Sequence, residues 1–124
     1  MLIPLVFEPP VRMDVTEDDL EDYTILQDYD DGTFVRIMNR RTSSDAYPSG
    51  WRYVMHYGVT DPDEADVPTL EDGTIRRYDN AHEDTKGHEP HVAPNPEPDT
   101  IEFSGIVDLH ARFWEEVPKP AIAP

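Results

Sequence analysis

The stretch that most constrains the fold is residues 51–59, where residue polarity alternates with a period of two. One side of this stretch carries Trp51, Tyr53, Met55, Tyr57 and Val59. The other side carries Arg52, Val54, His56 and Gly58. Such alternation predicts a β-strand whose apolar side lies against a hydrophobic core. It is the clearest strand of the chain, and the other expected elements are placed around it.

Two Asp-Gly turns predict further strands on either side of this one. Asp31-Gly32 would join two β-prone segments into a hairpin, and Asp72-Gly73 would lead the chain into another strand. A short segment with two apolar residues near the C-terminus is expected to add an edge strand. The strands are therefore expected at residues 23–29, 33–38, 51–59, 74–78 and 101–103.

One amphipathic helix is expected after these strands. Its apolar side would be formed, at helical spacing, by Ile106, Leu109, Phe113 and Val117. Ser104 can cap the start of this helix, and four prolines between residues 90 and 98 predict an extended connector before it. The predicted fold class is α+β, with an antiparallel four- to five-stranded meander sheet packed against one C-terminal amphipathic helix.

The length and the absence of cysteine limit the organisation of the chain. A chain of 124 residues suits one domain, and without Cys it has neither disulfides nor thiolate metal sites. We expect an N-terminal arm and acidic connector at residues 1–22, a single α+β domain at residues 23–117 and a Pro-rich tail at residues 118–124. No apolar run approaches the about 20 residues that span a membrane. The start lacks the basic segment of a signal peptide, so the expected location is the cytoplasm.

The chain is strongly acidic, with 27 Asp and Glu against 10 Lys and Arg and a net charge of −17. The acids are spread along most of the chain and lie mainly in expected loops, not in a single block. Molar salt shortens the Debye length to about 3 Å, which screens the repulsion within such a chain. The composition is typical of a halophilic protein, in which net charge says little about binding partners.

The few basic residues are concentrated on neighbouring elements of the expected sheet. The strip consists of Arg36, Arg40, Arg41, Arg52, Arg76, Arg77 and Lys86. A strip of positive side chains on an otherwise negative protein is the minimum expected of a surface that binds the phosphates of a nucleic acid. The alternative is that these side chains pair with nearby carboxylates on a solvated face of the sheet.

Three of the five histidines lie close together after the fourth expected strand. Cleavage of RNA without a metal needs a base for the 2′-hydroxyl, an acid for the leaving 5′-oxygen and cations around the phosphate. We expect His88 and His91 to be the acid–base pair, His82 to support them, and Asp79 to orient a histidine or fix the turn. Contacts to phosphate or RNA are expected from Arg77, Lys86, Arg76, Tyr78 and Arg52.

Two other interpretations of the same segment stay open. The nitrogens of His82, His88 and His91 and the carboxylate of Asp79 would suit zinc or another first-row divalent metal. Alternatively, Asp79 opens an ordinary turn and the histidines are polar surface residues.

Several local patterns occur in a fixed order along the chain. They are the hairpin turn Asp31-Gly32, the segment Tyr47-Pro48-Ser49-Gly50-Trp51-Arg52-Tyr53, the segment Arg77-Tyr78-Asp79-Asn80-Ala81-His82, and the pair His88 and His91 ahead of an amphipathic helix. Together they resemble the TumE-type toxins of toxin–antitoxin pairs, over about residues 23–117. In this chain Glu89 and Pro90 stand between the paired histidines, which lowers the local positive charge.

The resemblance implies a toxin that is neutralised by a cognate DNA-binding antitoxin of helix-turn-helix type, and it suggests RNA as the target. The hypothesis is a growth inhibitor that cleaves or binds RNA, acting as a metal-independent endoribonuclease if it is an enzyme. The alternatives are a non-catalytic binding module, for which the arginines matter and the histidines do not, and a small His/Asp metal-binding protein. A homo-oligomer also stays open.

Overall fold

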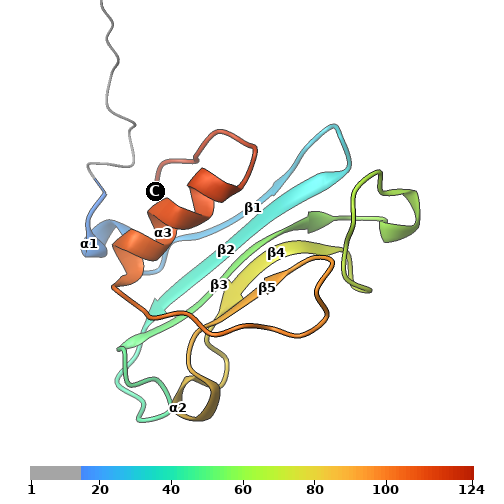
Figure 1. The fold of residues 1–124 in the computed structure, drawn as a ribbon. Coiled ribbons are helices and arrows are strands. Elements are labelled where there is room, and N and C mark those ends of the chain that lie inside the picture. Colours follow the sequence, from blue (N-terminus) through green and yellow to red (C-terminus); the bar gives the residue numbers. More distant parts are fainter. Residues whose placement is uncertain (1–14) are drawn as a thin grey trace, which may run out of the picture.

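The computed structural model describes residues 15–124, so most of the expected N-terminal arm lies outside the described part of the chain. Five antiparallel strands form one sheet in the order β1-β2-β3-β4-β5, so each strand pairs with its neighbours in sequence (Figure 1). The strands are β1 (Thr24–Asp28), β2 (Thr33–Arg41), β3 (Trp51–Val59), β4 (Thr74–Asp79) and β5 (Glu89–Val92). The predicted α+β meander is confirmed.

The longest helix, α3 (Ile106–Glu116), packs across one face of the sheet, as the sequence predicted (Figure 1). It begins after Gly105, so the expectation that Ser104 caps this helix is wrong. Shorter helical turns are α1 (Glu17–Leu20), α2 (Glu83–Lys86) and the 3-10 turn η2 (Pro62–Glu64). No helix in residues 15–124 has the length and apolar character needed to cross a membrane.

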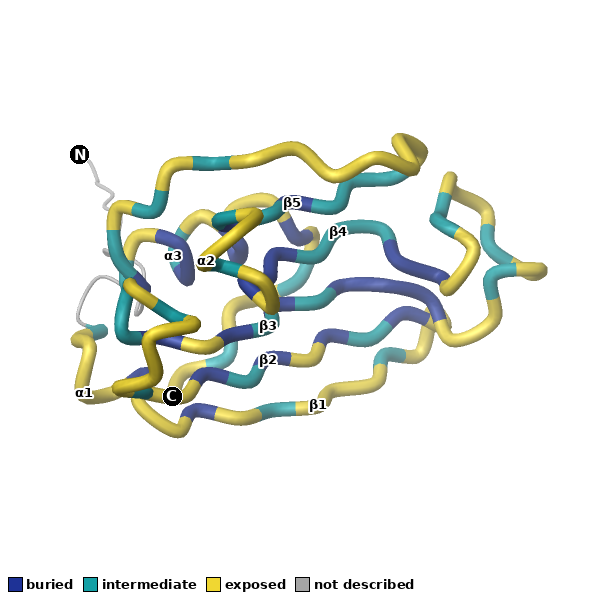
Figure 2. The backbone as a smooth tube through the Cα atoms, turned by 90° about the horizontal axis from the view of Figure 1, so that it is seen from below, coloured by how far each residue is buried: buried dark blue, intermediate teal, exposed yellow. Residues whose placement is uncertain are grey.

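The core lies between α3 and the sheet, because alternate residues of each strand point toward the helix. The buried core residues of the sheet include Val35, Ile37, Tyr53, Met55 and Tyr78. The helix contributes Ile106, Leu109, Phe113 and Trp114. Figure 2 shows buried positions along β2, β3 and β4, whereas β1 and the segment that leads into α3 are mostly exposed. The apolar alternation of residues 51–59 therefore faces the helix.

Both ends of the described chain also contact this core. Leu20 of α1 is fully buried, and the hydroxyl of Tyr23 donates a hydrogen bond to the carbonyl of Ile122 at 2.8 Å. The ammonium of Lys119 forms an ion pair with Asp31 at 2.5 Å. The residues just before β1 and after α3 thus contribute to the packing of the sheet.

The fifth strand differs from the sequence prediction. The expected edge strand at residues 101–103 is wrong, because Ile101 forms only an isolated bridge with His88. The strand lies at Glu89–Val92 instead, at the start of the segment that was expected to be a connector. Pro90 is tolerated there because β5 is an edge strand, where the missing N–H removes no central ladder bond.

This register gives the sheet two different faces. We call the face under α3 the helix-covered face. We call the opposite one the open face, and its residues include Phe34, Arg36, Arg52, Val54, His56, Arg77, Asp79, Glu89 and His91. No helix packs on the open face in the described chain, so this face is available to a binding partner (Figure 1).

Candidate functional site

A hollow of about 460 Å³ lies on the open face, where β4 ends and the chain turns toward α2. Its lining contains three histidines, two carboxylates and two arginines, together with two small apolar residues: Arg36, Val54, His56, Arg77, Asp79, Ala81, His82, Glu89 and His91. A second hollow at the other end of the sheet is lined mainly by acidic and apolar residues and contains none of the expected site residues. The first hollow is therefore the candidate site.

The strand register explains how the hollow gathers residues from distant parts of the sequence. His56 on β3 lies opposite Arg77 on β4, and Arg77 lies opposite His91 on β5. One step along the same face, Asp79 lies opposite Glu89. Directly opposed side chains in an antiparallel pair have Cβ atoms about 5 Å apart. The β-sheet itself thus assembles the site.

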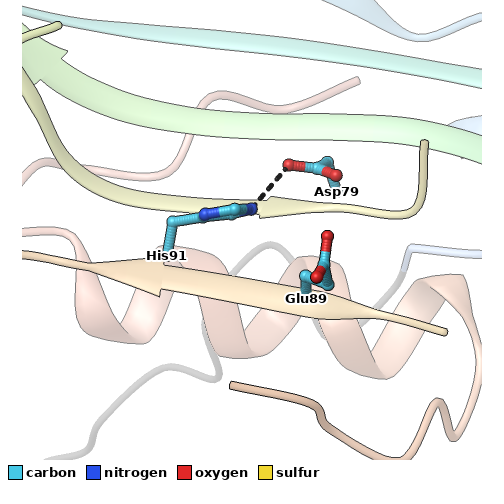
Figure 3. A group of neighbouring side chains, drawn as sticks. All are labelled: Asp79, Glu89 and His91. Atoms are coloured by element: carbon cyan, nitrogen blue, oxygen red, sulfur yellow. Dashed lines mark ion pairs between the residues drawn. The ribbon is translucent and has the colours of Figure 1, made fainter. Parts of the chain in front are cut away.

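Asp79 is the most enclosed carboxylate of this hollow, and it organises its neighbours. Its Oδ2 accepts a hydrogen bond from Arg77 Nε at 3.0 Å, and its Oδ1 accepts one from the backbone amide of Ala81 at 3.3 Å. Oδ2 also lies 3.2 Å from His91 Nε2, and Figure 3 marks this ion pair with a dashed line. Asp79 is therefore in contact with both a cation and a histidine, and it starts the turn after β4.

The imidazole of His91 is held on one side and open on the other. Nε2 is buried and close enough to Asp79 for an ion pair with the protonated ring, although the alignment is poor for a hydrogen bond. Within residues 15–124, Nδ1 has no hydrogen-bond partner. The ring thus has one nitrogen on Asp79 and one available to a ligand.

His56 occupies the β3 side of the hollow. Its Nε2 hydrogen bonds with Thr74 Oγ1 at 2.9 Å, and its ring meets Phe34 edge-on at 5.0 Å. Burial, followed by the charge of Arg77, lowers the pKa of His56 to about 4. His56 is therefore neutral near pH 7, where it can accept or donate a hydrogen bond but cannot supply a positive charge.

The basic residues fall into two groups. Most of those in the described range pair with carboxylates: Arg40, Arg41, Arg76, Arg77, Arg112 and Lys119. Arg36, Arg52 and Lys86 form no ion pair within that range, and Arg36 and Arg52 lie on the open face. The expectation that the basic strip pairs with nearby carboxylates is thus confirmed for Arg40, Arg41, Arg76 and Arg77. Binding of nucleic acid by the unpaired members stays a prediction.

His88 lies on the opposite side of the sheet from His91. Its ring stacks on Phe103 at 4.4 Å, and its Nδ1 hydrogen bonds with the hydroxyl of Tyr53 at 2.7 Å. Burial lowers the pKa of His88, and the nearby Glu83 carboxylate, 3.7 Å from Nε2, opposes that effect. Since side chains alternate along an extended chain, positions three apart point to opposite faces. The structure does not bring His88 and His91 together.

The other expected site residues are also divided. His82 is exposed and lines the hollow, as do Asp79 and Arg77. Tyr78 is fully buried, and its hydroxyl contacts Glu116 of α3, so its ring is not accessible to an RNA base. Arg76 pairs with the same glutamate at 3.3 Å. Lys86 ends α2, exposed and outside the lining of the hollow.

Asn80 and Glu83 fix the loop that follows Asp79. The Asn80 side chain accepts a hydrogen bond from the Tyr53 amide at 3.0 Å and donates to the Trp51 carbonyl at 2.6 Å. Glu83 accepts bonds from the amide and hydroxyl of Ser49, each at 2.7 Å, and from Asn80 at 2.8 Å. The two loops with the most specific local motifs are thereby tied together beside the hollow.

One group of side chains in the described range has the spacing of a metal site. One ligand atom each from Asp79, Glu89 and His91 lies within 4.8 Å of the others (Figure 3). Two carboxylates and an imidazole would suit a first-row divalent ion, but Arg77 already occupies Asp79 Oδ2 at 3.0 Å. The expected set that included His82 and His88 is not assembled, because His88 lies on the other face. We derive no step through a metal.

Comparison with protein families gives a match that spans most of the chain. A family model described as Toxin TumE matches residues 6–120. The chain belongs to the TumE toxin family. Membership implies a toxin with a cognate antitoxin partner. Comparisons with curated proteins and with solved structures give no match.

Three polar residues that line the hollow were not among the expected site residues: Arg36, His56 and Glu89. Glu89 was noted only as lowering the charge between the paired histidines, because Pro90 and the prolines after it predicted a connector from residue 90 and not a strand. Arg36 was recognised only as part of the basic strip. The alternation of His91 and Glu89 on either side of Pro90 was the available sign that both face the same way.

Proposed function

We propose that this TumE-family toxin inhibits growth by acting on RNA at the open-face hollow. The observation that supports this most directly is the contact of His91 with the enclosed carboxylate of Asp79, beside Arg77. A proton-transfer group, a carboxylate that orients it and a cation for phosphate are the parts that metal-independent phosphoryl chemistry needs.

The cations of the hollow would place the phosphate backbone. Arg36 is exposed and unpaired within the described chain, so it can contact phosphate without first breaking an ion pair. Arg52 extends the same face along β3, with its guanidinium 6.0 Å from the centre of the Tyr47 ring. Arg77 would act at the floor of the hollow while Asp79 holds its Nε. Lys86 would contact more distant phosphates from the end of α2.

In this proposal the two histidines of the expected acid–base pair, His88 and His91, have different roles. His91 keeps the proton-transfer role and Asp79 positions it, whereas His82 supports the site from the exposed rim. His88 becomes a positioning residue, because its stack with Phe103 and its bond to Tyr53 fix the start of β5. Tyr78 and Arg76 would act only through the packing of α3.

The composition bears on how RNA would be held. Contacts to phosphate weaken as salt rises, and the chain's acidic composition suits a halophilic cytoplasm. Hydrogen bonds and shape would then carry more of the affinity than charge does. The cognate antitoxin, expected to be of helix-turn-helix type, would neutralise the toxin by covering the same face.

The unpaired Arg36 and Arg52 support a second candidate, in which the toxin binds RNA without cleaving it. Neither side chain depends on a histidine for its position. Under this alternative, arginine substitutions would abolish growth inhibition and histidine substitutions would not.

The test is growth inhibition after induction in a halophilic host, with total RNA from the same cells examined for cleavage. We expect arrest and cleavage with the wild type, neither with His91→Ala, and weakened arrest with Arg36→Gln. Lys119→Gln is the matched control, because this cation lies at the tail and pairs with Asp31. Arrest without cleavage in both wild type and His91→Ala would favour the binding alternative. Full arrest by folded His91→Ala and Arg36→Gln variants would contradict both candidates.

A further inference from the structure

We infer that Glu89 is the general base that pairs with His91 as the general acid, and that the products of RNA cleavage carry a 2′,3′-cyclic phosphate and a 5′-hydroxyl. This inference rests on the proposed action on RNA and adds the reaction, the second catalytic residue and the substrate class. The substrate would be a ribonucleotide linkage with a free 2′-hydroxyl, in a strand that can lie against the open face.

The first observation is the position of Glu89 on β5. It lies two residues before His91 and opposite Asp79 on β4, so all three side chains project from the same face of two paired strands. One ligand atom from each lies within 4.8 Å of the others. Figure 3 shows Glu89 and His91 rising from one strand toward Asp79. A carboxylate and an imidazole at this separation can both reach the atoms around one phosphate.

The second observation is that, of the two carboxylates that line the hollow, Glu89 is the one without a side-chain partner in the described part of the chain. Asp79 is bonded to Arg77 and to the amide of Ala81, and Glu83 is bonded to Ser49 and Asn80. Glu89 makes no side-chain hydrogen bond or ion pair within residues 15–124, and it is half-buried at the hollow. A carboxylate with free lone pairs beside a substrate site can accept a proton.

The third observation is the division of labour between the two nitrogens of His91. Nε2 faces Asp79, whereas Nδ1 is free among the residues that the structure describes. The ion pair with Asp79 places Nε2 on the inner side of the ring, so Nδ1 can deliver a proton to a leaving oxygen. Glu89 forms no ion pair with the ring, so its carboxylate can accept the proton of the 2′-hydroxyl.

The step balances without any further reactant. The Glu89 carboxylate takes the proton from the 2′-hydroxyl, and the 2′-oxygen forms a bond to phosphorus. The bond from phosphorus to the 5′-oxygen breaks, and that oxygen takes a proton from the His91 imidazolium. Arg36 and Arg77 face the hollow and stabilise the negative charge on the non-bridging oxygens. Neither water nor a metal ion is consumed, and DNA cannot react because it lacks the nucleophile.

The experiment compares Glu89→Gln with the wild type on host total RNA and on a pool of synthetic single-stranded oligoribonucleotides, with a chelator present. Gln keeps the shape of the side chain and removes the base. Cleavage should slow by about 10²–10⁴-fold, while RNA binding and the thermal midpoint stay unchanged. Glu89→Asp should recover part of the rate. Glu102→Gln, on the exposed segment before α3, is the matched control and should cleave as the wild type does.

The product ends give a second readout. The expected 3′ product end is a cyclic phosphate that resists phosphatase until it is opened by acid, and an oligonucleotide with a single 2′-deoxy position should not be cut there. Wild-type-like cleavage by Glu89→Gln, 5′-phosphate ends or a requirement for divalent metal would each overturn the inference while leaving the proposed action on RNA intact. Absence of cleavage of either substrate by the wild type, both with the chelator and with added divalent metal, would overturn the inference together with the cleavage proposal.

Discussion

The two faces of the sheet use the same kinds of residue for opposite purposes, and His88 and His91 show this most directly. His88 is buried, stacked on Phe103 and bonded to Tyr53 on the helix-covered side. His91, three residues further on, has one nitrogen near Asp79 and the other free within the described chain. A histidine pair in a sequence is therefore a pair in space only if the backbone between them turns, and here it is extended.

The same contrast applies to the aromatic and charged residues. Tyr53, Tyr78 and Phe113 are enclosed between sheet and helix, so changing them should alter stability first. Arg36 and Arg52 lie exposed on the open face, so changing them should alter binding first. Substitutions on the two faces should therefore separate effects on stability from effects on binding.

The largest effect is expected from Phe113→Ala on the helix-covered face. Phe113 is fully buried on α3 and meets the ring of Tyr78 edge-on at 6.3 Å. Truncation should lower the free energy of unfolding by about 3–5 kcal/mol, because it removes apolar burial and leaves a cavity. Urea denaturation at fixed salt measures this. Leu26→Ala is the control, since Leu26 is 67% exposed on β1 and should change stability by less than about 0.5 kcal/mol.

Asn80→Ala should have the next largest effect, although Asn80 touches neither α3 nor substrate. The change leaves the buried amide of Tyr53 without its partner, and it leaves the carbonyl of Trp51 with only the 3.3 Å bond from the Ser49 hydroxyl. The orphaned amide costs about 1–3 kcal/mol and the lost bond to the carbonyl about 1 kcal/mol, so we expect a loss of about 2–4 kcal/mol in the free energy of unfolding. Asn95→Ala removes a similar amide from an exposed loop and should be nearly neutral. Equal effects of the two variants would show that the Asn80 side chain does not stabilise the start of β3.

A smaller effect, which depends on pH, is expected at His56 on the open face. Because the pKa of His56 is lowered to about 4 from an unfolded value of about 6.5, the unfolded chain binds the proton first as pH falls. The free energy of unfolding should therefore decrease between about pH 6.5 and pH 4, by about 2 kcal/mol from this residue.

His56→Gln isolates that contribution, because Gln can keep a bond to Thr74 and does not titrate. The difference in free energy of unfolding between variant and wild type, measured by urea denaturation at pH 7.5 and pH 4.5, should shift in favour of the variant at the lower pH. A difference that is independent of pH would show that His56 is not buried in its neutral form.

The smallest expected effects come from the unpaired arginines. Arg52→Gln should change the free energy of unfolding by less than about 0.5 kcal/mol. It should lower the slope of log affinity against log salt for single-stranded RNA by about 0.7, the loss of one phosphate contact. Fluorescence anisotropy titrations at several salt concentrations measure the slope. Arg41→Gln, whose cation pairs with Glu17 and Glu21, should leave it unchanged.

The sheet was predictable from the sequence wherever alternation and turn chemistry agreed. Residues 51–59 form β3 with the expected bounds, because five apolar residues at period two can be buried together only in a strand. The hairpin turn at Asp31-Gly32 was also informative, since the side chain of Asp31 accepts bonds from the amide and hydroxyl of Thr33. α3 followed from its apolar stripe.

The site was less predictable, because it depends on β5. Pro90 and the prolines after it argued for a connector, so Glu89 and His91 were not placed on a common face with Asp79. Only the pairing of β4 with β5 brings these residues together, and no local pattern encodes that pairing. For the same reason the sequence could not show that His88 points to the other side.

The neighbour-to-neighbour order of the sheet also has a consequence for how the chain folds. Each strand pairs with the next along the sequence, so each hairpin closes a loop that is shorter than the separation between α3 and the strands it covers, and the loop between β3 and β4 is the longest of them. By contrast, α3 must pack against strands that precede it by tens of residues. We expect the hairpins to form early and α3 to dock late, so that Phe113→Ala mainly accelerates unfolding and hardly slows folding. The strand pairing that forms the open face would then be complete before α3 docks on the other face of the sheet.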